Sequence, residues 1–354
     1  MSGPRASRFA FVDALRGFAA STVAGHHFYN ALRETTGTGE GQLWVEPFHS
    51  FLVVGSAGVF IFFVLSGFVI AHSVREARIG GRYVLRFALR RSLRLDPPYW
   101  VAIAVYLVAA WATGSTVYAD VDATTVALNA FYLDHITGVV SVLPVGWTLC
   151  LEFQFYLLFV ALLALAHRVG ERAGGVIFGA LFVGSILAGS GALPWHPPPG
   201  PDPYFITLWY LFFLGVTTQR VVTGRWSARW LVLVAFPCAA VTLVRGELGG
   251  LVGALTAAAL FAASRAGKLE SGLSHPALQW AGRVSYSLYL IHPLLGNRVI
   301  RWLARHYGAP TALAQQLAYF ALAAGLSLIA SQIFWWLVER PAMAAAQRVS
   351  ASSA

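Results

Sequence analysis

Four of the ionisable side chains in apolar stretches of the sequence are candidates for chemistry, because a charge is costly there. Arg16 and His27 belong to LRGFAASTVAGHHF, Glu152 to GWTLCLEFQFYLL and His292 to VSYSLYLIHPLL. Imidazole titrates near neutrality, and a carboxylate stabilises the imidazolium that forms when it takes a proton. His27 and Glu152 are therefore candidates for a base that deprotonates a hydroxyl group.

Arginines form a second group, which suits phosphates. Arg16 precedes His27 by eleven residues, about 16 Å of helix rise and close to three turns, so both side chains share one face. RRSLRLDPPYW adds Arg90, Arg91 and Arg94. A planar guanidinium binds phosphate through two parallel hydrogen bonds. A donor with phosphates at one end and a reactive group on a long arm, such as acyl-coenzyme A, would contact both groups.

Each candidate also has a purely structural interpretation. Arg16 could extend to the membrane interface and His27 could be a packed core histidine. The four-residue rhythm of the arginines also fits an amphipathic helix on anionic lipid. His292, which precedes a proline, could cap its helix, and Tyr289 could hydrogen-bond between helices. The functional alternative makes His292 and Tyr289 substrate-binding residues.

The composition is that of an integral membrane protein. Of 354 residues, 57% are hydrophobic and only 11% are charged, against roughly 25% charged in soluble domains. Apolar runs long enough to cross a bilayer predict an all-α polytopic protein with about ten transmembrane helices. The expected spans are 9–32, 51–73, 97–113, 146–167, 174–190, 204–219, 230–244, 248–264, 280–297 and 311–338.

The basic residues predict the orientation of these spans. Lys and Arg total 25 and the net charge is +10. With a cytoplasmic amino terminus, 18 of them fall in inner segments and five in outer segments, which agrees with the positive-inside rule. Both termini are then cytoplasmic, and the positive charge reflects topology rather than nucleic-acid binding. No cleavable signal peptide is evident, and residues 342–354 are expected to be a disordered tail.

Other chemistries find little support in the sequence. The two cysteines, Cys150 and Cys238, are far apart and form no CxxC or mixed His/Cys pattern, so neither a disulfide framework nor a metal site is expected. Ser66 has no nucleophile-elbow motif around it. Gly67, which follows it, is expected to allow close approach of a helix or a ligand.

Six motifs together resemble the acyltransferase 3 family of integral membrane acyltransferases. They are the Arg16–His27 spacing, GVFIFFVLSGFVI, RRSLRLDPPYW, GWTLCLEFQFYLL, VSYSLYLIHPLL and the closing WWLVERPA. The resemblance runs from Phe11 to Pro341. It implies a single transmembrane acyltransferase domain over residues 1–341. It also implies transfer of an acyl group, commonly acetyl, from cytoplasmic acyl-coenzyme A to a hydroxyl.

Site roles follow from this resemblance motif by motif. Arg16 and His27 match the essential pair of the family, Glu152 matches its acid, and Arg90, Arg91 and Arg94 match its basic motif. The chain departs from the family at Cys150 and Phe153, where polar residues are usual, and at the doubled proline after Asp96. The resemblance further implies a carbohydrate or glycolipid acceptor and a bacterial plasma (inner) membrane location.

Two readings from other functional classes stay open at this point. A proton-coupled secondary transporter or flippase would use the buried His and Glu as a proton relay and the arginines to attract an anionic substrate. A lipid-binding scaffold would use only the arginine-rich segment. The enzyme reading alone requires Arg16 and His27 to contact one ligand.

Overall fold

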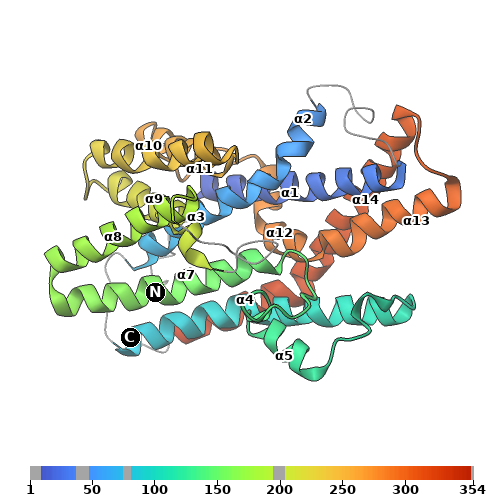
Figure 1. Ribbon diagram of the computed structural model, residues 1–354, viewed down its shortest axis with the longest axis horizontal. Coiled ribbons are helices and arrows are strands. Elements are labelled where there is room, and N and C mark those ends of the chain that lie inside the picture. Colours follow the sequence, from blue (N-terminus) through green and yellow to red (C-terminus); the bar gives the residue numbers. More distant parts are fainter. Residues whose placement is uncertain (1–8, 37–47, 75–80, 194–203, 352–354) are drawn as a thin grey trace. The chain divides into compact units, whose positions relative to one another are not determined.

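The computed structural model describes residues 9–36, 48–74, 81–193 and 204–351. Within these ranges every regular element is a helix (Figure 1). The helices form two compact units. Unit 1 comprises Met1–Val12, Phe60–Gly272 and Ala342–Ala354, and unit 2 comprises Asp13–Val59 and Leu273–Pro341.

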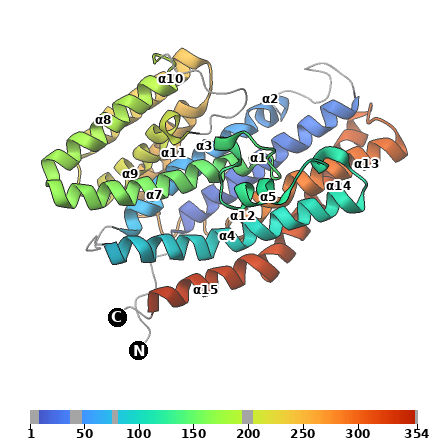
Figure 2. The same ribbon diagram turned by 60° about the horizontal axis from the view of Figure 1, so that its bottom comes forward.

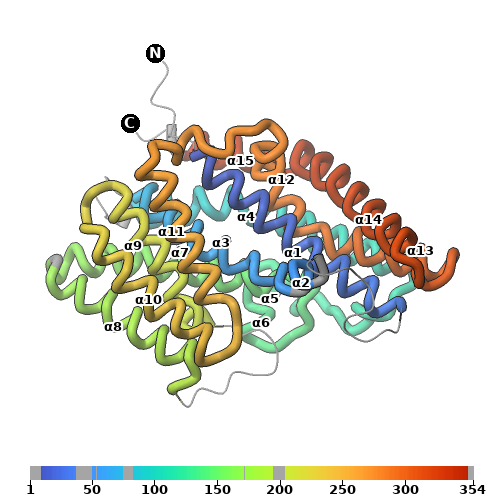
Figure 3. Tube along the Cα trace, turned by 90° about the horizontal axis from the view of Figure 1, so that it is seen from above, coloured from blue at the N-terminus to red at the C-terminus, as the bar shows by residue number. Residues whose placement is uncertain are grey.

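Unit 1 contains most of the apolar helices. Helices α8 to α11 pack against one another and stand together in Figure 3, and α4 packs on α7. The elements of unit 1 are α3 (Gly58–Ser73), α4 (Gly81–Ala112), η2 (Thr116–Tyr118), α5 (Ala123–Ala130), α6 (Asp134–Thr137), α7 (Gly146–Val169), α8 (Glu171–Gly189), η3 (Phe205–Thr207), α9 (Trp209–Val222), α10 (Ala228–Arg245), α11 (Gly249–Arg265) and α15 (Arg340–Ala351).

Helices α3 and α9 approach each other at two glycines. A Cβ atom on Gly67 would collide with the carbonyl oxygen of Phe212, and one on Gly215 would collide with that of Val64. Small residues of this kind allow helix backbones to meet closely in a membrane, where van der Waals packing drives association. The close approach expected at Gly67 is therefore to a helix.

Helix α4 joins the arginine-rich segment to the apolar span that was expected from residue 97. It starts at Gly81 and passes through Pro97 and Pro98 without a break. The carboxylate of Asp96, just before the prolines, accepts hydrogen bonds from Ser92 and from the Tyr132 hydroxyl. Arg90, Arg91 and Arg94 consequently lie on the same continuous helix as the apolar residues that follow.

Unit 2 contains the first helix and the carboxyl-terminal ones. The buried Glu339 accepts a hydrogen bond of 2.6 Å from the Ser287 hydroxyl, which links the closing motif to α12. The elements of unit 2 are α1 (Ala10–Thr36), α2 (Phe48–Val53), η1 (Val54–Ala57), α12 (Pro276–His292), η4 (Pro293–Asn297), α13 (Arg298–Tyr307), α14 (Leu313–Phe334) and η5 (Trp335–Glu339).

Helices occupy each of the ten segments expected to span the membrane. In the described part of the chain, six are long and apolar enough to do so, namely Ser50–Ser73, Tyr83–Ala112, Gly146–Val169, Arg172–Gly189, Ala228–Arg245 and Leu313–Val349. The others are shorter or, like α1, carry several ionisable residues. The protein is an integral membrane protein, whereas the total of ten spans stays a prediction.

The segment expected to be a disordered tail is largely helical in the structure. Helix α15 continues to Ala351. Its AMAAAQR sequence is rich in strong helix formers, which explains why the helix persists beyond the apolar span. Figure 2 shows α15 running beside α4.

Candidate active site

Helices α1 and α12 lie side by side in unit 2, with matching spacing between their contacts. A Cβ atom on Gly17 of α1 would lie 2.6 Å from the backbone nitrogen of Gly282 on α12. Ten residues further along each helix, the imidazole rings of His27 and His292 lie 5.2 Å apart. The equal interval means that the two helices run parallel and bring the two histidines together.

His292 is completely buried and offers one nitrogen for a ligand. Its Nδ1 donates a hydrogen bond of 2.9 Å to the Leu288 carbonyl, so the proton is on Nδ1 and Nε2 carries a lone pair. Nε2 has no hydrogen-bond partner among the described residues. His292 thus bonds back to a carbonyl of its own helix, which continues past it into η4 (Pro293–Asn297), and presents an acceptor for a hydroxyl donor.

The neighbouring histidines His26 and His27 differ in what their nitrogens contact. His26 Nδ1 donates to the Leu52 carbonyl at 2.9 Å, and its Nε2 accepts from Asn30 Nδ2 at 2.9 Å. His27 makes ring contacts with His26 and His292 but no hydrogen bond to a described residue. His26 is a structural residue, whereas the His27 imidazole is available to a substrate.

Arg16 lies on the same continuous helix as His27. Its Nε is buried and has no hydrogen-bond partner in the described part of the chain. Arg283, next to Gly282 on α12, instead places its guanidinium 5.6 Å over the ring of Trp335. Of these two arginines, Arg16 is the better placed to hold an anionic ligand.

Glu152 is the centre of a hydrogen-bonded cluster in unit 1. Its Oε1 accepts a hydrogen bond of 2.6 Å from the Ser66 hydroxyl of α3 and another from the Tyr156 hydroxyl one turn along α7. Tyr156 is also 3.4 Å from Ser66. The expected partnership of Glu152 with His27 stays a prediction.

Tyr156 connects Glu152 to the arginines of α4. The Arg91 guanidinium lies 4.4 Å above the Tyr156 ring, a cation–π contact. Arg91 also lines a pocket of 280 Å³ together with Arg90 and Arg94. The sequence places Glu152 and these arginines at opposite ends of a ligand, but in the structure a single tyrosine contacts both.

Comparison with known proteins gives a family that agrees with this geometry. The model of the acyltransferase 3 family, described as "Acyltransferase domain", matches residues 9–336 and so includes parts of both units. The chain belongs to this family. It is an acyltransferase, which decides against the transporter and scaffold readings.

Two curated relatives resemble the acyltransferase over almost their full length. Nodulation protein 10 of Rhizobium leguminosarum bv. viciae is 28% identical over 364 residues, covering 94% of this chain and 92% of the relative. Acyltransferase MdmB of Streptomyces mycarofaciens is 26% identical over 376 residues, covering 96% of this chain and 93% of the relative. No solved structure matches significantly.

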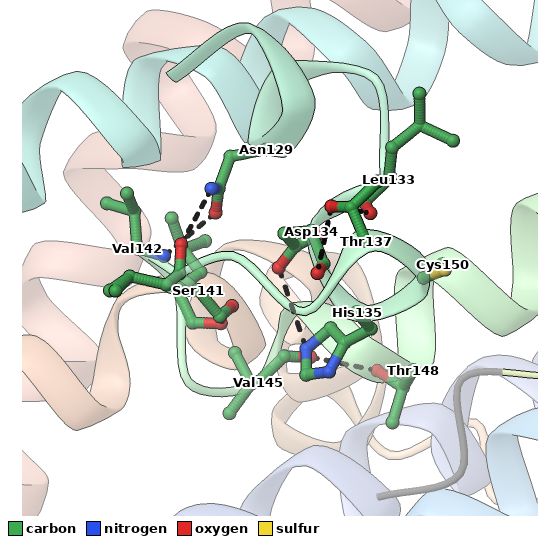
Figure 4. A network of polar contacts seen from close by, with 12 residues as sticks. Asn129, Leu133, Asp134, His135, Thr137, Ser141, Val142, Val145, Thr148 and Cys150 are labelled. Carbon is green, nitrogen blue, oxygen red and sulfur yellow. Dashed lines mark hydrogen bonds and ion pairs between the residues drawn. The ribbon is translucent and has the colours of Figure 1, made fainter. Parts of the chain in front are cut away.

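The acyltransferase also has a buried polar cluster that the sequence analysis did not single out. It lies in the connection between α4 and α7 (Figure 4). The Asp134 carboxylate is 1% exposed, and neither oxygen has a hydrogen-bond partner in the described ranges. His135 Nε2 lies 3.6 Å from Asp134 Oδ2. Burial lowers the pKa of His135, and the nearby Asp134 opposes that shift.

Hydrogen bonds make this connection a folded layer rather than an open loop. The fully buried Asn129 side chain donates to the Val140 carbonyl at 2.9 Å and accepts from the Val142 backbone at 2.8 Å. Tyr118 donates to the Val142 carbonyl at 2.9 Å. In the sequence, the buried cluster is visible only as an Asp-His dipeptide, and a dipeptide does not show that its side chains are buried.

Ser66 and Tyr156 have larger roles in the structure than sequence motifs indicate, because neither belongs to a recognisable catalytic motif. The contacts of Ser66 with Glu152 and Tyr156 join positions far apart along the chain. Tyr289, a predicted substrate-binding residue, is buried with its ring 6.0 Å from that of His292.

Proposed function

We propose that this acyltransferase moves an acetyl group from cytoplasmic acetyl-coenzyme A to a hydroxyl of a carbohydrate or glycolipid outside the bacterial inner membrane. The observation that carries the proposal is on α1. One helix bears an arginine and a histidine about 16 Å apart along its axis. Within the described ranges the Arg16 Nε has no hydrogen-bond partner, and the His27 imidazole makes ring contacts with two histidines. A long donor with anionic and reactive ends fits that interval.

His27 acts as the general base in this proposal. It takes the proton of the acceptor hydroxyl as the oxygen attacks the thioester carbonyl carbon, so that an ester C–O bond forms and the C–S bond breaks. The imidazolium then returns the proton to the departing thiolate. Glu152 supplies the carboxylate that stabilises the imidazolium, and an acyl-histidine intermediate is the covalent variant of the same scheme.

His292 and Tyr289 position the acceptor. The His292 Nε2 lone pair accepts a hydrogen bond from a hydroxyl of the substrate, and Tyr289 packs beside it. Both residues lie on the helix that runs in register with α1, which supports their assignment to the same reaction. Arg16 and the arginines of α4 hold the phosphates of the coenzyme.

The orientation of the chain follows from its basic residues. Ten spans with both termini in the cytoplasm place 18 basic residues in inner segments and five in outer segments, as the positive-inside rule demands. The arginines of α4 then face the cytoplasmic donor. The reaction requires no metal in this scheme.

Release of free thiol from acetyl-coenzyme A by purified protein tests the proposal. The wild-type protein is expected to release thiol in the presence of a hydroxyl acceptor, and His27→Ala is expected to lower the rate by about 10²- to 10⁴-fold because it removes the base. Arg16→Ala is expected to raise the KM for the donor by about 10-fold or more, since it removes a charged hydrogen-bond donor.

Two controls accompany this assay. His306→Ala removes an exposed histidine of α13 and should leave the rate unchanged. Binding of acetyl-coenzyme A to His27→Ala should persist, which shows that the variant is folded. Full transfer activity in His27→Ala would overturn the assignment of the base. If the wild type released no thiol with any hydroxyl acceptor, the assignment of acetyl-coenzyme A as the donor would be overturned.

A further inference from the structure

The carboxyl-terminal helix α15 forms one wall of the arginine pocket. Three of its residues, Met343, Ala346 and Gln347, line the 280 Å³ cavity. Facing them are the three arginines and the aromatic pair of α4, and the end of α3. The sequence motifs include only the first three residues of α15, Arg340 to Ala342, and the family match ends at residue 336.

The lining of this pocket has two chemically different sides. Tyr83 and Phe87 stack with ring centroids 6.3 Å apart, and the Met343 thioether and the Ala346 methyl add apolar surface. The guanidiniums of Arg90, Arg91 and Arg94 supply the charge, and no acidic side chain is among the described lining residues. A ligand with a flat aromatic group and attached phosphates matches both sides.

The Gln347 side chain adds a group that can recognise the edge of an aromatic base. An amide both donates and accepts hydrogen bonds, as a purine edge requires. At 280 Å³ the cavity is just below the usual range of about 300–1,000 Å³ for small-molecule sites. It accommodates a fragment of a coenzyme and not the whole of one.

We propose that α15 belongs to the donor site and that this pocket binds the phosphoadenosine end of the donor. The base lies against Met343 and the aromatic pair, Gln347 contacts its edge, and the arginines hold the phosphates. The identity of the ligand as a coenzyme A thioester rests on the proposed function. The role of α15 in nucleotide binding is new to this site.

Titration calorimetry with adenosine 3′,5′-bisphosphate tests the pocket without catalysis. Wild-type protein in detergent is expected to bind this nucleotide more tightly than inorganic phosphate. Gln347→Ala and Met343→Ala should each weaken nucleotide binding by about two- to ten-fold, the usual effect of one lost contact, and leave phosphate binding unchanged. Arg348→Ala is the matched control, because it removes a charge from the same helix outside the pocket.

Steady-state kinetics with two donors provide the second readout. Gln347→Ala should raise the KM for acetyl-coenzyme A by the factor found for the nucleotide and leave kcat unchanged. The KM for acetyl-pantetheine, which lacks the nucleotide, should not change. Wild-type-like nucleotide binding in both α15 variants, or equal KM increases for the two donors, would overturn the role of α15.

These outcomes separate the inference from the function on which it rests. Thiol release by the wild type together with unaltered nucleotide binding in the α15 variants leaves the transferase function standing and removes the pocket assignment. Nucleotide binding that depends on Gln347, with no thiol release from any donor, leaves the pocket assignment standing and removes the proposed donor.

Discussion

Tyr156 performs two tasks with two parts of one side chain. Its hydroxyl hydrogen-bonds the Glu152 carboxylate, and its ring lies under the Arg91 guanidinium. Arg91 in turn lines the pocket that we assign to the donor. The binding of an anion at Arg91 is therefore one side chain away from the predicted catalytic carboxylate.

Substitution of Tyr156 should separate these two tasks. Tyr156→Phe keeps the ring but leaves Glu152 with one donor fewer, so we expect kcat to fall by about 10-fold at constant KM for acetyl-coenzyme A. Tyr156→Leu also removes the cation–π contact and should raise that KM by about two- to five-fold. Thiol-release kinetics of the two variants give both numbers. An effect of Tyr156→Phe on KM alone would contradict this division.

Several site residues could be predicted from the sequence because they are chemically out of place. Arg16, His27, Glu152 and His292 stand out as ionisable groups among apolar ones. Ser66 and Tyr156 are ordinary residues of membrane helices, and their importance depends on a contact between α3 and α7. Such a contact is a property of packing, which one-dimensional spacing does not encode.

Glycine contacts determine how closely the helices of unit 1 approach. Gly67 and Gly215 meet the backbone of the facing helix directly, so their missing side chains set the distance between α3 and α9. Ser66, adjacent to one of these contacts, donates its hydrogen bond to Glu152 from the same helix. Packing at the glycines thereby positions the hydrogen-bond donor of the carboxylate.

A pair of glycine substitutions tests this at the level of the helix. Gly67→Ala forces α3 and α9 apart, and we expect a destabilisation of about 1–3 kcal/mol together with lower activity. Gly179→Ala on α8 meets no atom within 4 Å, and it should be neutral or stabilising by up to about 1 kcal/mol. Thermal unfolding in detergent measures both, and equal stability of the two variants would argue against the close approach.

Helix boundaries illustrate what sequence reasoning misses at this scale. The ten apolar segments could be located from the sequence because the hydrophobicity of a segment is the sum over its residues. The arginine spacing indicates a helix before residue 97, but nothing in it shows that this helix continues into the apolar span through Pro97 and Pro98. In the structure the helix continues there, and the nearby Asp96 is hydrogen-bonded to Ser92 and Tyr132.

The whole molecule has a charge asymmetry that predicts its orientation. The layer between α4 and α7 is expected outside and the turn between α9 and α10 inside, since the arginines gather at the latter. Both native cysteines, Cys150 and Cys238, are buried. They leave a low background for labelling of cysteines introduced at exposed positions.

Cysteine labelling of intact cells checks the orientation. Thr137→Cys, at an exposed position of α6, should react with a membrane-impermeant maleimide added outside. Thr223→Cys, at an exposed position after α9, should react only after the cells are permeabilised. The opposite labelling pattern would show that the orientation is inverted and that the arginine pocket lies on the outer side.

The parallel pairing of α1 and α12 has a consequence for how the chain can vary in length. One residue inserted between Gly17 and His27 would turn the histidine by about 100° and move it by about 1.5 Å. The insertion would separate it from His292 unless α12 gained a residue over the same interval. Indels within either interval are therefore tolerated only as compensated pairs, so these two distant stretches of the gene share a single length constraint.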